Sequence, residues 1–503
     1  MKKNFLFLLA LLCTTAQVGW AQSEMDTVYV SKKDHPDAAY FLPEPPDTNS
    51  VAFIDDMIQW EWGKSQRNTP RGEQASRETP WLPEIMRTVM AEVLQIDTIS
   101  DEKTPALSRL LVKSYNTGNQ STVAPKETYS RKRPIVRLNE DTWGKYDSDF
   151  LRTNGSYPSG HTAFGWATAL AFAEMWPELQ DTILRRGVQF GENRIITGAH
   201  WQSDVNAGYL CAAASMAKAH TNPDFLKDVL AARAEYAKLK GLPAGYDPVS
   251  KADVPHGEDF LNMPVDTASY RYAADVLQFW DAKRLRDTER GKQAEEEADY
   301  SVEMMQKVFG EAMGININIS PVSTPAICEL IELVLNKASE TADRLKPIRF
   351  RKRPFVQLGE HTTVPEDEEK EKGKSSFPSG HTNLGWSMAL VMAEVAPEQQ
   401  NEILRRGYQY GYNRLIAGYH WASDIEASRL LACALVARLH ADLPFLQLVY
   451  RARYEFLLNA TGITTVLDDQ EPASSPAYLL NGIPAAPDSH GIIIQNGQKF
   501  LVK

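Results

Sequence analysis

Apolar residues recur along most of this chain with the spacing of an α-helix. One stretch places five apolar residues on a single face at the i, i+3, i+4, i+7 spacing: Leu82, Ile85, Met86, Val89 and Val93. Longer segments rich in Ala, Leu and Met follow at residues 161–176, 201–219 and 224–240. Because no run alternates like a strand before the C-terminal end, the pattern predicts an all-α fold.

The C-terminal end has a different pattern. Three consecutive isoleucines, Ile492 to Ile494, precede Asn496-Gly497, and the apolar run Phe500 to Val502 follows. Asn-Gly between two apolar runs is typical of a two-residue type I′ turn, so we expect a short β-hairpin. The hairpin could be a packed terminal ribbon, or a tail of the kind that some export systems recognise.

The same unit occurs twice along the chain. Residues 156–204 and 376–424 align without a gap and share about 30 of 49 residues, at an offset of 220. Weaker matches extend this similarity in both directions, from the tryptophans Trp60 and Trp280 to the glutamates Glu235 and Glu455. The sequence therefore predicts a tandem duplication.

A chain of 503 residues is long enough for two domains of about 200 residues each. We expect a first helical-bundle domain at residues 41–240 and a second at 260–460. Residues 241–259, rich in Pro, Gly and Asp, form the predicted linker. Residues 461–503 remain as a C-terminal tail that carries the hairpin. The two domains could pack about a pseudo-twofold axis, as homodimers do.

The first 21 residues resemble a cleavable export signal. Lys2 and Lys3 precede the apolar run Phe5 to Leu12, and the small residues Gly19 and Ala21 follow. The apolar run is shorter than the roughly 20 residues that a membrane span needs. We therefore expect a periplasmic or secreted protein with no integral membrane span.

Net charge, cysteine spacing and motif content limit the partners, disulfides and cofactors that we expect. The formal net charge of −11 argues against nucleic acid and anionic membranes as main partners. Cys211, Cys328 and Cys433 show no CxxC spacing, which favours buried thiols, although one pair could form a disulfide. No HExxH, CxxC or calcium-loop motif occurs, so no metal or other cofactor is expected.

Three short polar segments recur at fixed spacing in both copies. The first contains Lys126 and, seven positions later, Arg133. The second is Pro-Ser-Gly-His, ending at His161. The third contains Arg194 and His200, followed four positions later by Asp204. His220 and His440 also recur, but each ends an apolar helix, so C-terminal capping explains them.

The residue types in these segments suit a phosphate dianion. Arginine and lysine provide fixed and mobile cationic donors. Ser159 and Gly160 begin a helical stretch, whose free N–H groups can face an anion. His200 and Asp204 lie four apart, so on a helix the carboxylate can orient the imidazole. Glycines at positions 187 and 191 share the helical face of Arg194 and indicate close packing beside it.

The three segments resemble the signature of the phosphatidic acid phosphatase type 2 (PAP2) superfamily. The first copy, with GSYPSGHT at 155–162 and GAHWQSDV at 198–205, is similar to bacterial class A acid phosphatases. The second copy reads SSFPSGHT and GYHWASDI. The family usually has serine before the third-segment arginine, where this chain has Asn193 and Asn413. Because an amide can still donate a hydrogen bond, we expect this difference to modify the activity rather than abolish it.

The resemblance implies a role for each matched residue. It implies that His200 attacks phosphorus, that Asp204 orients it, and that His161 protonates the leaving oxygen. The remaining matched residues of the first copy would bind phosphate: Lys126, Arg133, Ser159, Gly160 and Arg194. The second copy repeats the whole set: Lys346, Arg353, Ser379, Gly380, His381, Arg414, His420 and Asp424. The implied substrates are small phosphomonoesters, and vanadate would bind as a phosphate mimic.

One neutral and one protonated histidine would give a bell-shaped rate profile with an acidic optimum, around pH ~5–6. Two alternative functions stay open. The protein could be a vanadate-dependent haloperoxidase. Alternatively, only one copy could be catalytic, while the other binds phosphate or supports it structurally.

The stretches between the first and second segments differ, and both should border the site mouth. Copy one carries aromatic residues there, Trp143, Tyr146 and Phe150, whereas copy two carries acidic ones, Glu366, Asp367, Glu368, Glu369 and Glu371. We expect copy one to accept aryl or nucleoside phosphates and copy two to repel polyanions.

Overall fold

A computed structural model describes residues 27–144, 149–314 and 319–461, together with four short strands near the C-terminus. The first half of the chain forms the helices α2 (Ala38–Phe41), α3 (Val51–Gln66), α4 (Pro70–Arg77), α5 (Pro83–Leu94), α6 (Pro105–Gln120), α7 (Val123–Tyr129), α8 (Pro134–Arg137), α9 (Asp149–Thr153), α10 (Gly160–Met175), η1 (Pro177–Leu179), α11 (Gln180–Ile196), α12 (Gln202–Ala219) and α13 (Pro223–Leu239). The expected signal segment, residues 1–21, and Tyr146 lie outside the described residues.

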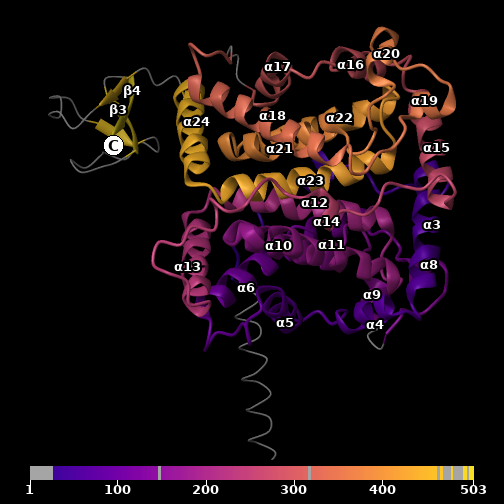
Figure 1. The fold of residues 1–503 in the computed structure, drawn as a ribbon. Coiled ribbons are helices and arrows are strands. Elements are labelled where there is room, and N and C mark those ends of the chain that lie inside the picture. The colour runs from indigo at the N-terminus through magenta and orange to yellow at the C-terminus, as the bar shows by residue number, and fades with distance from the viewer. Residues whose placement is uncertain are drawn as a thin grey trace, which may run out of the picture.

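The second half repeats this series of helices. It forms α14 (Gly257–Phe260), α15 (Tyr270–Lys283), α16 (Glu289–Glu296), α17 (Val302–Ala312), α18 (Pro325–Leu345), α19 (Pro354–Leu358), η2 (Pro365–Asp367), α20 (Glu368–Glu371), α21 (Gly380–Val395), α22 (Gln400–Ile416), α23 (Ala422–His440) and α24 (Leu443–Thr461). Figure 1 shows the two halves as two stacked groups of helices, with α12 and α23 where they meet. The prediction of an all-α fold for both repeated units is confirmed.

A buried central helix organises each half. Every residue of α10 is buried, and its neighbours are α6, α11 and α12. A helix that is apolar on all sides fits such a position. Ser159 caps α10, because its side-chain oxygen accepts a hydrogen bond from the Thr162 N–H. Ser379 caps α21 in the same way. The second polar segment therefore lies at the start of the most buried helix.

The helices expected at 161–176, 201–219 and 224–240 are confirmed as α10, α12 and α13. The expected apolar face of α5 is only partly right. Met86 and Val89 are buried, but Leu82 is the residue before the helix and is 52% exposed. Pro83 begins the helix, and the residue before a proline is disfavoured in helical conformation. The apolar periodicity therefore extended one residue beyond the helix.

The C-terminal strands form one small sheet in the order β1-β4-β3-β2. The strands are β1 (Thr465–Leu467), β2 (Ala477–Leu479), β3 (Gly491–Gln495) and β4 (Gln498–Val502). β3 and β4 pair antiparallel with Gln495 opposite Gln498, and the expected turn residues Asn496-Gly497 lie outside the described residues. β1 and β2 were not expected, because three-residue strands carry too little alternation to stand out.

Equivalent residues of the two copies contact each other where the halves meet. The rings of His220 and His440 lie 3.8 Å apart, and Asn206 Nδ2 donates to Glu426 Oε1 at 2.7 Å. In both pairs the partners are 220 positions apart, which is the offset of the repeat. Short helices are also exchanged, since α2 packs on α22 while α14 packs on α11. Such reciprocal contacts are those of a symmetric dimer interface.

A buried histidine–glutamate cluster lies at this interface. Nε2 of His220 lies 2.9 Å from Glu174 Oε2, and Nε2 of His440 lies 2.9 Å from Glu394 Oε2. Each Nδ1 donates at 2.8 Å to the carbonyl four residues earlier in its own helix, so the expected capping role is confirmed. Burial acts to lower the pKa of His220, but Glu174 and Glu394 raise it to about 9.

This cluster should make the stability of the protein depend on alkaline pH. The folded protein holds the His220 proton more tightly than the unfolded chain, whose histidine pKa is near ~6.5. The stabilisation is therefore complete below that pH and is lost as pH rises through about 9. We expect the free energy of unfolding to fall by up to about 3 kcal/mol over this range. Urea unfolding at pH 6.5 and pH 9 measures it, and the variant His220→Gln should show a flatter dependence. An equal fall in both proteins would contradict this assignment.

The three cysteines of the described residues are buried free thiols: Cys211, Cys328 and Cys433. The favoured reading of the sequence, buried thiols, is confirmed. Burial raises the pKa of Cys211 and of Cys433 to about 12, so both thiols stay protonated at physiological pH.

Within the described residues, no single helix is both long and apolar enough to cross a bilayer. Taken together, α23 and residues 443–459 of α24 reach that length and apolarity, but they meet at a bend of 97°.

Candidate active site

The three polar segments of the first half converge at the start of α10. Arg133 Nη1, from the first segment, lies 2.8 Å from His200 Nε2 of the third. Ser156, just before the Pro-Ser-Gly-His segment, donates its hydroxyl to Asp204, and the Ser159 N–H donates to the Asp204 carbonyl at 2.9 Å. Side chains about 70 positions apart in the sequence therefore form one hydrogen-bonded cluster.

Arg194 presents unpaired donors to this cluster. It lies on α11, its side chain is buried, and within the described part of the chain its Nε and Nη1 have no hydrogen-bond partner. Burial, reinforced by the nearby charge of Arg133, lowers the pKa of Arg194 to about 9. A buried guanidinium without an acceptor is costly, and an anion between the two arginines would satisfy it. In the second half, Nε and Nη1 of Arg414 likewise have no hydrogen-bond partner among the residues that the structure describes.

Lys126 lies beneath the Pro-Ser-Gly-His segment. Its ammonium group donates to the carbonyls of Gly155 at 3.0 Å and Ser156 at 3.3 Å, and also to that of Pro158. Burial, followed by the charge of Arg133, lowers its pKa well below the usual value. The lysine therefore fixes the backbone that leads into the start of α10.

Gly160 begins α10 in a confined space. A Cβ atom there would lie 3.2 Å from Asn119 Oδ1, which is closer than ordinary van der Waals contact. Glycine therefore keeps the helix N-terminus open beside the two arginines.

His200 is held as an imidazole whose Nε2 points at Arg133. Its Nδ1 lies 3.4 Å from Asp204 Oδ2, so the carboxylate favours the tautomer that carries the proton on Nδ1. Burial, followed by the charge of Arg133, lowers the pKa of His200 well below its usual value. The unprotonated Nε2 is therefore available as a nucleophile in the cluster.

Asp204 stays ionised because of a residue that our sequence reasoning missed. Burial alone would raise its pKa, but the Arg131 guanidinium, 2.6 Å from Oδ1, holds it below the usual value. Arg131 also binds Asp56 of α3 at 2.7 Å. Arg351 repeats both contacts in the second half. Arg-Lys-Arg-Pro recurs at 131–134 and 351–354, and this repetition could have identified these arginines.

His161 faces the cluster from the first turn of α10. Its Nε2 lies 2.9 Å from the Thr79 carbonyl, which can only accept, so Nε2 carries a proton and Nδ1 is the free ring atom. Burial, followed by the charge of Arg194, lowers the pKa of His161 well below its usual value. Trp81 packs edge-on against this ring at 5.6 Å, and sequence reasoning gave no signal for it.

Aromatic side chains border the first site. Phe150, half exposed on α9, lies 6.3 Å from Trp81 between ring centroids. The backbone N–H of Trp143 donates to the Thr197 carbonyl of the third segment at 2.9 Å. Of the three expected aromatic residues, Phe150 therefore reaches His161 only through Trp81, and Trp143 is joined to the third segment through its backbone.

The amide of Asn193 points away from the cluster. Its Oδ1 accepts from Arg71 at 2.5 Å, and its Nδ2 donates to Glu78 at 2.8 Å. Asn413 makes the equivalent contacts with Arg290 and Glu297. Asn193 therefore links α4 to α11, and Asn413 links α16 to α22 in the same way.

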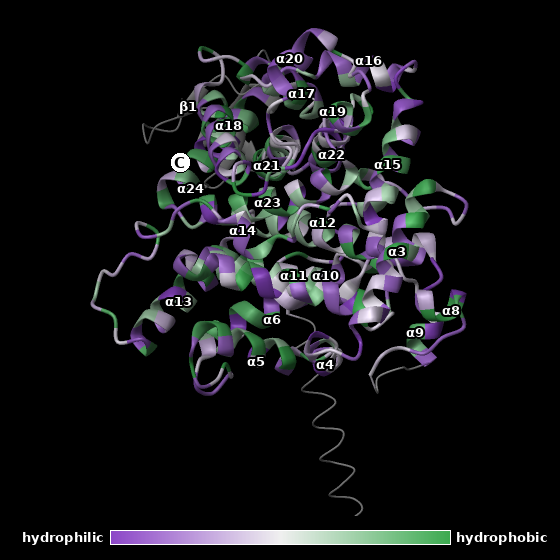
Figure 2. Cartoon of the chain, turned by 45° about the vertical axis from the view of Figure 1, so that its right-hand side comes forward, coloured by the Kyte–Doolittle hydropathy of each residue, from purple (hydrophilic) through white to green (hydrophobic). Residues whose placement is uncertain are grey.

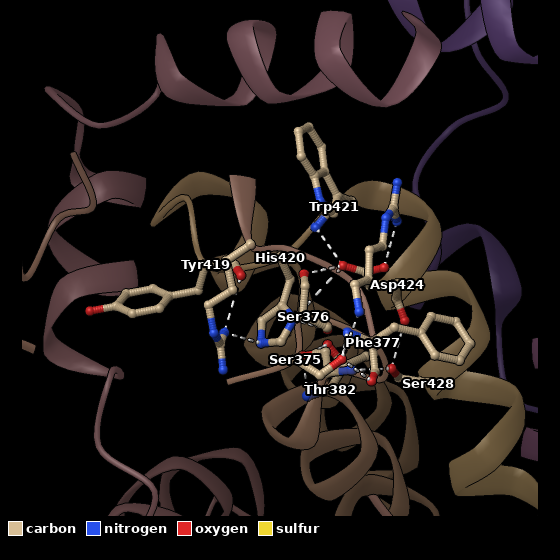
Figure 3. A network of polar contacts seen from close by, with 12 residues as sticks. Ser375, Ser376, Phe377, Thr382, Tyr419, His420, Trp421, Asp424 and Ser428 are labelled. Carbon is tan, nitrogen blue, oxygen red and sulfur yellow. Dashed lines mark hydrogen bonds and ion pairs between the residues drawn. The ribbon is translucent and has the colours of Figure 1, made fainter. Parts of the chain in front are cut away.

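The second half brings the corresponding residues together (Figure 3). Arg353 Nη1 lies 3.1 Å from His420 Nε2, and the Ser376 hydroxyl donates to Asp424. His420 Nδ1 lies 2.6 Å from the Ser376 carbonyl and 4.0 Å from Asp424. The tautomer is therefore the same as in the first half, but here a backbone carbonyl fixes it.

The other predicted residues of the second half also lie here. His381 Nε2 lies 2.9 Å from the Ala298 carbonyl, as His161 does from that of Thr79. A Cβ atom on Gly380 would lie 3.7 Å from Lys346 Nζ. Lys346, unlike Lys126, is paired with an acid, Asp343, at 2.8 Å.

A separate cavity of about 970 Å³ lies between the halves. Its lining includes Trp62 of α3 and Tyr270 of α15, but none of the predicted catalytic histidines. The residues that the sequence predicts to bind phosphate therefore lie in the two clusters, and none of them lines this cavity.

Comparison with known proteins agrees with this duplication. The family model described as "PAP2 superfamily" matches residues 109–224 and 326–447, one region in each half. A non-specific acid phosphatase of Providencia stuartii is 39% identical over 216 residues, 43% of this chain and 87% of the relative. One of Salmonella typhimurium is 33% identical over 237 residues, 47% of this chain and 92% of the relative. An acid phosphatase of Zymomonas mobilis is 33% identical over 196 residues, 39% of this chain and 74% of the relative. The chain belongs to the PAP2 superfamily.

Proposed function

We propose that this protein is an exported acid phosphatase that hydrolyses phosphate monoesters at two sites, one in each half. The observation that carries the proposal is a pair of buried arginines, Arg194 and Arg414. Each lies in a cluster with an imidazole, and its Nε and Nη1 have no hydrogen-bond partner within the described part of the chain. The names of the relatives, acid phosphatases in each case, support the same reaction. The signal-like N-terminus supports export to the periplasm or the medium.

The first step forms a phosphohistidine. Arg133 and Arg194 bind the nonbridging oxygens together with the Ser159 hydroxyl and the Gly160 N–H, and they neutralise the charge that develops there. His200 Nε2 attacks phosphorus while the bond to the leaving oxygen breaks. His161 donates its Nδ1 proton to that oxygen, and the product alcohol leaves.

The second step releases phosphate. His161, now neutral, accepts a proton from water as the water oxygen attacks the phosphohistidine, and the bond from phosphorus to Nε2 breaks. His161 is then protonated again. Because burial lowers its pKa, the protonated form needed in the first step becomes scarce as pH rises. This supports an acidic optimum. The second half would use His420, His381 and Asp424 in the same roles.

Hydrolysis of para-nitrophenyl phosphate by the full-length protein tests this function. Arginine and lysine already supply the positive charge, so we expect full activity in excess EDTA, a maximum near pH ~5–6 and competitive inhibition by orthovanadate. Loss of activity in EDTA, or a flat profile through pH 8, would contradict the proposal. Halide oxidation in the presence of vanadate would instead support a haloperoxidase.

We also propose that the halves pack about a pseudo-twofold axis and differ in substrate. The contacts between equivalent residues support the axis. Trp81 and Phe150 beside His161 support stacking of aryl or nucleoside groups in the first half.

A further inference from the structure

The two clusters differ in what binds the arginine of the first segment. In the first half, Arg133 Nη2 donates to Asn154 Oδ1 at 3.1 Å and to the Gly155 carbonyl at 3.2 Å, both neutral. In the second half, Arg353 Nη2 donates to Glu371 Oε2 at 2.9 Å. A carboxylate is therefore bound to Arg353, whose Nη1 also lies 3.1 Å from His420 Nε2.

Glu371 is held in this position from both sides. Lys374 Nζ donates to its other carboxylate oxygen at 2.6 Å. The Glu371 side chain is 19% exposed and that of Arg353 only 5%, so water screens the pair weakly. Burial acts to raise the pKa of Glu371, but the Lys374 hydrogen bond and the Arg353 charge bring it below the usual value. The carboxylate therefore stays charged at acidic pH.

The segment that carries Glu371 is anchored to the site. Glu368, at the start of α20, accepts from the Thr362 N–H at 2.6 Å. The Tyr419 hydroxyl donates to the Val364 carbonyl at 3.1 Å, and Tyr419 directly precedes His420. α20 itself lies at the edge of the molecule in both views (Figure 1 and Figure 2). Glu371 thus reaches inward from a surface segment that is fixed to the third polar segment.

The sequence encodes this difference between the copies. At the repeat offset of 220, Glu371 corresponds to Leu151 and Lys374 to Asn154. The first half therefore has an apolar residue and an amide where the second half has an acid and its lysine. Arg414 nevertheless keeps its two unpaired donors within the described residues, so the second cluster still presents donors for an anion.

We propose that Glu371 is an internal competitor for phosphate, which makes the second half bind phosphate more weakly than the first. The inference rests on the proposed function, because it takes both clusters as phosphate sites. Carboxylate and phosphate compete for the same guanidinium geometry. An incoming dianion must either displace Glu371 from Arg353 or bind beside a like charge, and both reduce its affinity. The penalty grows with ligand charge, so polyanionic esters are disfavoured most.

The substitution Glu371→Gln tests this, with Glu369→Gln as the matched control. Glu369 lies on the same short helix and its removal changes the net charge equally, but its side chain is 81% exposed and pairs with Lys372. Calorimetric titration of the full-length protein with inorganic phosphate should resolve two sites that differ by about tenfold or more in affinity. Glu371→Gln should tighten the weaker site about tenfold, and Glu369→Gln less than about twofold. Loss of the weaker site in Arg353→Ala assigns it to the second half.

An unchanged weaker site in Glu371→Gln, an equal effect of both substitutions, or a single class of sites in every variant would overturn the inference. Equal melting temperatures of the two glutamine variants would show that the change in phosphate affinity does not come from a change in stability. Hydrolysis by His200→Ala separates this inference from the proposed function. If that variant is inactive while Glu371→Gln still tightens phosphate binding, catalysis in the second half is refuted and the role of Glu371 stands.

Discussion

Replacing both histidines that we propose attack phosphorus, His200→Ala together with His420→Ala, should lower kcat for phosphate monoesters by at least about 10⁴-fold. Without an imidazole at either position no phosphohistidine can form, and water would have to attack phosphorus without covalent catalysis. Steady-state hydrolysis of para-nitrophenyl phosphate measures the effect. Phosphate binding should persist in the double variant, because both pairs of arginines remain.

The single variants distribute this activity between the halves. His200→Ala leaves only the second half active, and His420→Ala only the first, so the two should rank aryl, nucleoside and polyanionic phosphates differently. His361→Ala is the control, because that side chain is 82% exposed and we assign it no catalytic role. Identical substrate preferences in the two single variants would refute the difference between the sites.

Removing Arg194 should also lower the rate strongly. With the second half inactivated by His420→Ala, the substitution Arg194→Ala should lower kcat by roughly 10²–10³-fold, the usual loss for one donor to a developing anion. Arg194→Lys should recover part of the rate, since it restores the charge but not the planar pair of donors. Steady-state kinetics across the three proteins measures both effects.

Stability distinguishes this role from a structural one. Nε and Nη1 of Arg194 have no hydrogen-bond partner among the described residues, so burial of this guanidinium destabilises the fold. Arg194→Ala should therefore leave the melting temperature unchanged or raise it while activity falls. Arg284→Ala, at a side chain 82% exposed, should change neither. A strong loss of stability in Arg194→Ala would indicate that the arginine mainly supports the fold.

The site residues could be predicted because their spacing is repeated. The serine, glycine and histidine at the start of α10 form a capped helix N-terminus in one continuous segment, and His200 and Asp204 lie four apart. Residues that are close together in the sequence could therefore be assigned to one site from local helix geometry alone. It did not reveal that Lys126 binds backbone carbonyls, because that contact depends on how α7 meets the second segment.

Contacts between distant segments could not be predicted. The ion pair of Arg131 with Asp56 joins residues 75 positions apart, and no local pattern marks such a pair. The same is true of Glu371, which belongs to an acidic run that resembles any solvated loop until its contact with Arg353 is seen. The reciprocal interface depends on tertiary packing of two similar sequences, so the duplication made it plausible without locating it.

We propose that each half carries an imidazole that attacks phosphorus. Rapid acid or base quenching during turnover of para-nitrophenyl phosphate, followed by peptide mass spectrometry, tests it most directly. We predict an acid-labile, base-stable phosphoryl group on the peptides that contain His200 and His420, each lost in its own alanine variant. Turnover with no phosphoryl group on either histidine would contradict the account.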